Sequence, residues 1–197
     1  QNFGQWTDGG SYTAAQRAHH VWQQWLREFE RPPIDDAVQA ALEPYKAEFA
    51  DAMTQALRDK LGLGTAQADD SALADDLLRL MAADRVDYTI AMRALAQFST
   101  EPGASNSAVR DHFIDRDGFD ARAARYRTRL QAESSIDAPR AARMNRVNPK
   151  YVLRNHLAET AIQQAQAGDM SEVQRLLKVL QRPFDEQPEH DADAGFP

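Results

Sequence analysis

The sequence predicts an all-α protein, built as an irregular bundle of about eight or nine helices. Two observations predict it: apolar residues recur at intervals of three and four, and capping residues, prolines and glycines punctuate the chain at the ends of these patterns. A third supports it, because no run of alternating β-branched residues marks a strand.

The first helix is expected to follow a loop over residues 1–12. Thr13 and Gln16 can form a capping box, in which each side chain bonds the other residue's free backbone N–H. The helix then runs to about Glu30, where Arg31-Pro32-Pro33 ends it because proline disfavours helix in the preceding residue. Its apolar face comprises Ala18, Trp22, Trp25 and Phe29.

The second helix is expected to be capped by Asp35 or Asp36. Pro44 lies inside its apolar pattern and is predicted to kink or restart it. Gly62 and Gly64 suit a left-handed C-terminal cap. The face of this helix comprises Val38, Leu42, Tyr45, Phe49, Met53, Ala56 and Leu57.

Four helices are expected in the middle of the chain, with a loop over 99–107 between the second and third of them. Asp69 and Asp70 are predicted to cap the first of the four, and Asp117 the last. The expected ranges are 70–82, 84–98, 108–115 and 117–132.

The C-terminal third is expected to hold three more helices. Pro139 opens a short one that ends near Met144. Asn148-Pro149 is typical of an N-cap followed by a first-turn proline, and predicts a helix over 149–167 that Gly168 stops. Its buried face is predicted to comprise Val152, Leu153, Leu157, Ala161 and Ala165.

Ser171 and Gln174 are predicted to cap the last helix, which runs to about Gln181. The acidic, aperiodic tail 184–197 is expected to be extended over the surface or disordered.

The composition excludes several classes of protein. The 197 residues include no cysteine, so thiolate metal sites and disulfides are excluded. No apolar run approaches the ~20 residues that span a membrane, and no signal peptide opens the chain. The net charge of −7 argues against nucleic acid as a partner. The lack of cysteine fits a reducing compartment, and a cytoplasmic location is expected. Because the first residue is Gln1 and not Met, the sequence is expected to be a fragment, a processed chain or an incomplete gene.

Positive charge is concentrated in residues 116–154, where ten Lys and Arg stand against four Asp and Glu. This segment therefore carries +6 and the remainder −13. The favoured interpretation is that these arginines pair with carboxylates of neighbouring helices. The alternative is a surface for phosphate or another anion, which would bind in a salt-sensitive way.

No motif for catalysis or metal binding is found, and we predict no catalytic, cofactor-binding or metal-binding residue in this chain. His156 is interpreted as a packing residue, and His190 with Asp191 and Asp193 as a poor metal site in a tail. Residues 62–64 lack the Lys-Ser/Thr of a phosphate loop, and 115–120 fails as a calcium loop because Phe119 replaces an oxygen ligand.

The most distinctive segment is 145–159 (Asn-Arg-Val-Asn-Pro-Lys-Tyr-Val-Leu-Arg-Asn-His-Leu-Ala-Glu). It combines a helix-start signal, a dense apolar face and the polar pair Arg154-Asn155. We interpret that pair as bonding backbone carbonyls or carboxylates inside the fold, in preference to catalysis.

Here the sequence resembles the C-terminal region of the selenoprotein O (YdiU) family of protein adenylyltransferases. Residues 147–155 (Val-Asn-Pro-Lys-Tyr-Val-Leu-Arg-Asn) are similar to a family signature, and the resemblance covers about residues 35–190. Further matching segments, in family order, are 60–63, 77–81, 87–89, 113–116, 168–172, 175–177 and 182–188.

The resemblance implies a parent with a kinase-like fold, a pseudokinase by descent, that transfers AMP from ATP to Ser, Thr or Tyr hydroxyls of proteins (AMPylation). ATP and Mg or Mn would bind in a kinase-like core upstream of the matched segment, so no family site residue carries over to this chain.

The implied partners are that core and the protein substrates, with no nucleic acid and no membrane. The expected division is 1–34 poorly matched to the family, 35–183 the helical region and 184–197 the tail. The alternative function is a free-standing helical protein-interaction module.

Overall fold

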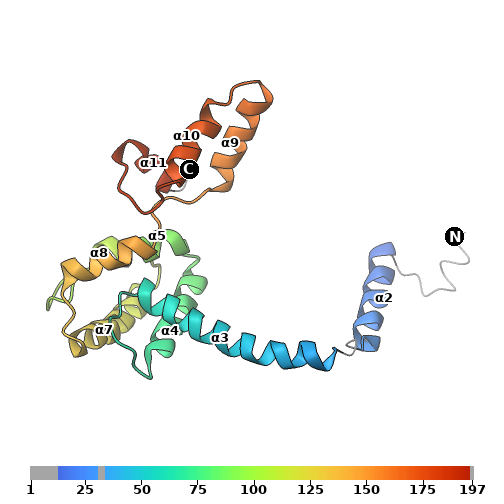
Figure 1. The fold of residues 1–197 in the computed structure, drawn as a ribbon, viewed down its shortest axis with the longest axis horizontal. Helices are drawn as coiled ribbons and strands as arrows, with labels where there is room; N and C mark the ends of the chain where they lie inside the picture. Colours follow the sequence, from blue (N-terminus) through green and yellow to red (C-terminus); the bar gives the residue numbers. More distant parts are fainter. Residues whose placement is uncertain (1–12, 31–33, 196–197) are drawn as a thin grey trace, which may run out of the picture. The chain divides into compact units, whose positions relative to one another are not determined.

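The computed structural model describes residues 13–30 and 34–195, and the regular structure in these ranges is entirely helical (Figure 1), as predicted. The chain divides into two compact units, Gln1–Ala47 and Glu48–Pro197. In chain order the elements are α2 (Ala14–Glu28), α3 (Asp36–Lys60), α4 (Asp70–Asp84), α5 (Tyr88–Leu95), α6 (Ser107–Arg110), α7 (Arg116–Ala132), α8 (Asp137–Val147), α9 (Asn155–Gln166), α10 (Ser171–Leu180), the 3₁₀ turn η1 (Pro188–His190) and α11 (Asp191–Ala194). None of these helices is long and apolar enough to cross a membrane.

Helix α2 begins as predicted. The Thr13 side chain accepts from the Gln16 N–H at 3.2 Å, and the Gln16 side chain accepts from the Thr13 N–H at 2.8 Å. Both halves of the capping box are therefore present. The predicted apolar face lies along one side of α2, and its Trp and Phe side chains are exposed.

Helix α3 is capped by Asp35, whose side chain accepts from the Ala37 N–H at 2.8 Å. It continues through Pro44 as one element, so of the two predicted alternatives, a kink or a restart, the restart does not occur. Proline removes one N–H from the ladder and leaves the carbonyl four residues earlier without its donor. That carbonyl belongs to Ala40, an exposed residue, so water can supply the missing bond.

The C-terminus of α3 closes on Gly62, which has the predicted left-handed conformation with φ +69°. The Gly62 N–H donates to Asp59 O and the Leu63 N–H to Arg58 O, the two bonds of a Schellman motif. Leu61 and Leu63, on either side of the glycine, are both buried in the core. Gly64 does not share this conformation, because the positive φ occurs only once in the motif.

Gly62→Ala is expected to destabilise the protein by about 2–4 kcal/mol, combining left-handed backbone strain with overpacking. A Cβ at this position would lie 2.7 Å from both Arg140 Cγ and Met144 Sδ, in the core. Gly168→Ala is the matched control, because its φ is +90° but a Cβ would meet nothing within 4 Å. It should lose only about 1 kcal/mol. Urea unfolding followed by circular dichroism measures both; equal losses would contradict the packing argument.

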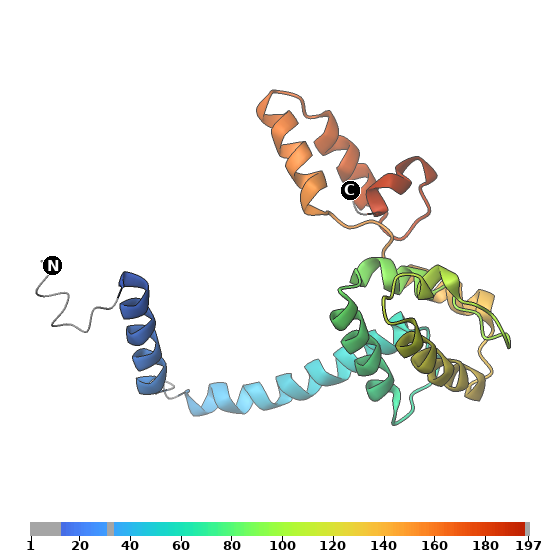
Figure 2. The ribbon, with the colours of Figure 1, turned by 180° about the vertical axis from the view of Figure 1, so that it is seen from behind.

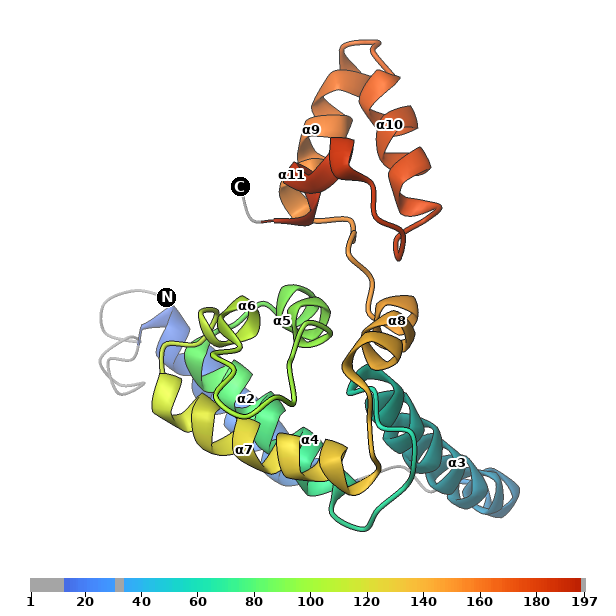
Figure 3. The same cartoon turned by 90° about the vertical axis from the view of Figure 1, so that its left-hand side faces the viewer.

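The core of the second unit lies where α4 packs against α7 (Figure 3), with α5 and α6 adding to it. The rings of Phe98 and Tyr126 lie 5.0 Å apart, and those of Phe113 and Phe119 lie 4.8 Å apart. The largest fully buried apolar side chains are Tyr151, Phe98, Met92, Leu130, Met144, Val109 and Val179.

Two helix starts differ from the prediction. Arg85 takes a left-handed conformation that ends α4, and Asp87 then caps α5 by accepting from the Ile90 N–H at 2.8 Å. The helix expected from residue 84 therefore begins at Tyr88. Helix α7 is capped by Asp115, which accepts from the Gly118 N–H at 2.8 Å, and not by Asp117 as predicted.

The prediction that Asn148-Pro149 opens a helix is wrong. Asn148 is the C-cap of α8, residues 149–154 form no regular structure, and α9 begins only at Asn155. Leu153, predicted to be buried, is exposed, whereas Ala161 is buried as expected. The cause is tertiary: the side chain of Asn148 bonds α3 instead of the first turn of a helix.

Helices α9 and α10 form an antiparallel hairpin, seen from opposite sides in Figure 1 and Figure 2. Gly168 turns the chain with φ +90°, as predicted. The predicted capping box of Ser171 and Gln174 is not formed, because Asp169 accepts from the Ser171 N–H and Ser171 lies inside α10. Residues 184–195, expected to be extended or disordered, contain η1 and α11.

Candidate functional site

The segment 145–159 joins three parts of the second unit through buried polar groups. Asn148 is 0% exposed, its amide donates to Lys60 O at 2.8 Å, and its Oδ1 accepts from Lys60 Nζ at 3.4 Å. These bonds join residues 88 positions apart in the chain. Asn148 therefore fixes the end of α8 against the end of α3.

Arg93 of α5 is bonded to the same turn from the other side. Its Nη1 donates to Asn145 O at 2.8 Å and to Asn148 O at 2.9 Å. Its Nη2 donates to Phe184 O at 3.2 Å and to Glu186 Oε1 at 2.6 Å. One guanidinium thus connects α5, the end of α8 and the start of the C-terminal tail.

Lys150 and Tyr151 extend this connection. Both N–H groups donate to Pro183 O, at 2.8 and 3.1 Å. The Lys150 ammonium lies between Glu186 and Asp191, at 2.6 and 2.7 Å. Burial lowers the pKa of Lys150, but its hydrogen bonds to Asp191 and Glu186 outweigh that effect and raise it, so the ammonium stays charged.

Arg154 bonds a carboxylate and a carbonyl, as predicted for it. Its Nη1 lies 2.9 Å from Asp87 Oδ2, and its Nη2 donates to Ala194 O at 3.3 Å. The hydrogen bond from Arg154 holds the pKa of Asp87 below its usual value, against the opposing effect of burial. Its neighbour Asn155 is exposed in the first turn of α9.

A second buried cluster joins α4 to α7. Arg129 Nε donates to Asp70 Oδ1 at 2.6 Å, its Nη1 to Glu133 at 2.9 Å and its Nη2 to Thr65 O at 2.6 Å. Asp69 stands at the N-cap of α4 but makes no capping bond, and Asp70 bonds Gln67 N–H and Arg129. The prediction that these two acids cap α4 is therefore wrong.

Six of the ten cations in the basic segment 116–154 pair with carboxylates, in agreement with the favoured interpretation. Besides Arg129, Lys150 and Arg154, the cations Arg125 and Arg140 pair with Asp76 and Asp137. Arg122 donates to the carbonyls of Asp76 and Gly118.

Residues 184–195, the described part of the acidic tail, hold no metal cluster. Arg175 lies between Glu172 and Asp193, and His190 Nδ1 is 3.7 Å from Asp193 Oδ2. Across residues 13–30 and 34–195, no group of three or more His, Asp or Glu is placed to hold a metal ion. The carboxylates that the sequence placed near His190 serve as partners of Arg175 and Lys150.

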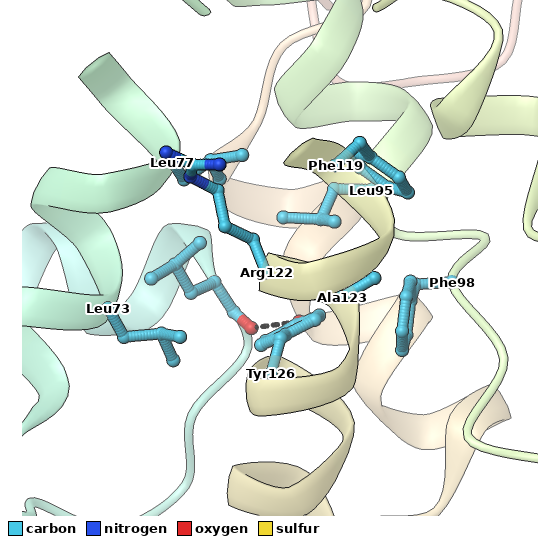
Figure 4. A pocket seen from close by; sticks show the side chains of 9 residues that line it. Leu73, Leu77, Leu95, Phe98, Phe119, Arg122, Ala123 and Tyr126 are labelled. Atoms are coloured by element: carbon cyan, nitrogen blue, oxygen red, sulfur yellow. Dashed lines mark hydrogen bonds between the residues drawn. The ribbon is translucent and has the colours of Figure 1, made fainter. Parts of the chain in front are cut away.

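A small apolar hollow lies between α4, α5 and α7 (Figure 4). Leu73, Leu95 and Phe119 line it, and the Tyr126 hydroxyl donates to Leu61 O at 2.6 Å beside it. Its volume is about 30 Å³ and its walls are almost wholly apolar. Such a space takes a water molecule or two and does not fit a nucleotide, so we assign it to core packing.

Comparison with known families shows to which family this chain belongs. The model of the family "Protein adenylyltransferase SelO" matches residues 23–181, which is most of the chain. The chain belongs to the SelO family. The SelO match begins inside α2, upstream of residue 35 where the sequence reasoning placed the resemblance, and it ends at the last turn of α10.

Curated SelO relatives agree with this assignment. The chain is 54% identical over 164 residues to proteins named "Protein nucleotidyltransferase YdiU" from Burkholderia multivorans, Burkholderia ambifaria and Paraburkholderia xenovorans. Each match covers 83% of this chain but only 31–32% of the relative. The chain thus spans about a third of the length of the SelO proteins that it matches.

The sequence identified the segment 145–159 but not the residues that its polar side chains bond. Of Asn148, Lys150 and Arg154, only the last was predicted to bond inside the fold, and its partner is Asp87. The bonds of Asn148 to Lys60 and of Lys150 to Glu186 were not predicted. The buried Arg93 and the Asp70–Arg129 pair were missed. No local signal reveals them, because the partners of Arg93 lie 52–93 residues away and Asp70 lies 59 residues from Arg129.

Proposed function

We propose that this chain is the C-terminal helical part of a cytoplasmic protein adenylyltransferase, and that its residues are structural and not catalytic. The parent would transfer AMP from ATP to Ser, Thr or Tyr hydroxyls of protein substrates. A kinase-like core outside this chain would bind ATP with Mg or Mn. Membership of the SelO family supports the activity of the parent, and the second unit's polar contacts support the role of this part.

One observation carries the structural role: the acids that could perform chemistry are bound to cations that hold helices together. The pKa values of these acids lie below their usual values, because hydrogen bonds from Arg or Lys, joined for Asp70, Glu133 and Asp137 by backbone N–H groups, outweigh the effect of burial. A general acid needs a pKa near the working pH, and these carboxylates are ionised far above theirs. They include Asp70, Asp76, Asp87, Asp120, Glu133, Asp137, Glu172, Glu186 and Asp191.

The same contacts indicate what the structural role would be. Arg93, Lys150 and Arg154 tie α5, the turn after α8 and the C-terminal tail into one braced body. A rigid body of this kind suits packing against a catalytic core, where it would fix the position of elements beside the cleft.

The 197-residue chain is expected to transfer no AMP. Incubation with labelled ATP, Mg or Mn and a mixed protein acceptor should give labelling equal to that of heat-treated chain. The positive control is the full-length Burkholderia multivorans relative under the same conditions. Metal-dependent transfer by the 197-residue chain above background would refute the structural assignment.

A second candidate is a free-standing interaction module, and exposed aromatic side chains on α2 favour it. The reading frame upstream of the codon for Gln1 distinguishes the two functions. A kinase-like core in frame supports the first, and a native start codon directly before Gln1 supports the second.

A further inference from the structure

Helix α2 presents an apolar surface that we call the aromatic face: Val21, Trp22, Trp25, Leu26 and Phe29. Trp22 is 55% exposed, and Trp25 and Phe29 are each 67% exposed. The opposite side of α2 is polar, with Gln24 bonded to Glu28. The helix is therefore strongly two-sided, and both of its tryptophans lie on the apolar side.

The size of this exposed apolar face is that of an interaction surface. At ~250 Å² for each tryptophan, Trp22 and Trp25 alone expose roughly 300 Å² of mostly apolar surface. An isolated helix of ~15 residues is also marginally stable in water, and most helices are stabilised by packing of their apolar stripe. No described residue of α2 is buried. A partner must therefore supply the packing.

The relatives indicate which partner fits. Trp25, Leu26 and Phe29 lie inside the range matched by the SelO family model, so this half of the face is SelO sequence. The matched 164 residues make up 31% of the Burkholderia multivorans protein, so about two-thirds of that protein lies outside the match.

Covalent connection favours this remainder over a second copy of the chain. A segment joined to α2 by the backbone is present at an effective concentration on the order of millimolar, so a modest apolar contact suffices to hold it. A second copy would have to reach the same contact from solution and overcome the loss of translational freedom.

We propose that the aromatic face of α2 is the surface on which the remainder of the SelO protein packs. The inference rests on the proposed function, because it takes this chain to be part of a longer SelO protein. It names the place of contact within unit Gln1–Ala47 and the kind of partner: an apolar surface of the same polypeptide.

Thiol labelling tests this directly, because the chain contains no cysteine. Leu26→Cys places a thiol on the aromatic face, and Gln24→Cys places one on the polar side of the same helix. Each is made in the 197-residue chain and in a full-length chimera, in which residues 23–181 replace the corresponding segment of the Burkholderia multivorans relative. Labelling by a maleimide is followed by mass spectrometry of the α2 peptide.

In the 197-residue chain the two thiols should label at similar rates. In the chimera, labelling at position 26 should slow by about tenfold or more, since it then requires local opening of the contact. Labelling at position 24 should change by less than about twofold. Slow labelling at position 26 in the 197-residue chain, or fast labelling in the chimera, would overturn the proposal; the former indicates cover by this chain or a second copy.

A second measurement tests the proposal without requiring that the chimera folds. Cysteines placed at the positions aligned with 24 and 26 in the natural full-length relative should show the same contrast in rate, and equal fast rates would overturn the proposal. AMP transfer by each protein is recorded separately. Protection at position 26 without transfer would count against the proposed activity alone, and transfer without protection against the docking surface alone.

Discussion

Arg140→Ala is expected to lower the free energy of unfolding by about 3–5 kcal/mol, because it removes a buried cation and leaves a cavity. Arg140 is the largest fully buried side chain, at 0% exposure. Its guanidinium donates to Phe98 O and, at 2.8 Å, to Asp137 Oδ1. Its aliphatic stem packs beneath Gly62.

Two further variants separate the contributions of charge and volume. Arg140→Met keeps most of the volume but leaves Phe98 O without its donor, so the expected loss is about 1–3 kcal/mol. Arg146→Ala, at an exposed position of the same helix, should change stability by less than about 0.5 kcal/mol. Urea unfolding followed by circular dichroism gives all three values. A loss for Arg140→Ala no larger than that for Arg146→Ala would show that the buried guanidinium contributes nothing.

Asp70→Asn is expected to cost about 3–5 kcal/mol at pH 7, since it leaves the Arg129 guanidinium buried without its main counter-charge. Both side chains are nearly inaccessible, and Arg129 connects α4, α7 and the loop at Thr65 through them. Asp69→Asn is the matched control, because Asp69 is exposed and makes no capping bond. It should change stability by less than about 0.5 kcal/mol.

The same pair predicts a dependence on pH. Burial raises the pKa of Asp70, but hydrogen bonds from Arg129 and the Gln67 N–H outweigh that effect and leave it below its usual value. Burial also raises the pKa of Glu133, but hydrogen bonds from the Gly64 N–H and Arg129 outweigh that effect and leave it below its usual value. The stabilisation is therefore complete above the unfolded values of about 4 and is lost as pH falls through the lowered ones.

Urea midpoints of the parent chain should thus fall as the pH drops from about 5 toward 3, and those of Asp70→Asn should fall less steeply over that window. The change of urea midpoint with pH in Asp69→Asn serves as the reference. Parallel curves for Asp70→Asn and the parent chain would rule out a stabilising role for the ionised Asp70 carboxylate.

Local sequence signals predicted the features that depend on neighbouring residues. Thr13 and Gln16 cap α2, and Gly62 and Gly168 end their helices, because each contact lies within a few positions. The helical fold and the family segment followed from the same signals. The partners of the buried polar groups could not be predicted, since no spacing links Asn148 with Lys60 or Asp70 with Arg129.

Asn148-Pro149 shows how such a distant partner overrides a local preference. Asparagine followed by proline is a good helix start, but the buried amide of Asn148 bonds Lys60 O instead, and Arg93 takes its carbonyl. Leaving a buried polar group without its hydrogen bonds destabilises the fold by more than a helix cap would stabilise it. The chain therefore delays α9 by six residues, to Asn155.

The shared acceptor Pro183 O has a consequence for engineering. The N–H groups of Lys150 and Tyr151 both donate to this oxygen. The stretch from Tyr151 to Pro183 therefore begins and ends at the same place in the second unit. The α9–α10 hairpin is thus a cassette with adjacent ends. A hairpin from another SelO protein could be grafted there if it keeps Arg175, which pairs with Asp193, and Val179, whose carbonyl accepts from Gln187 Nε2.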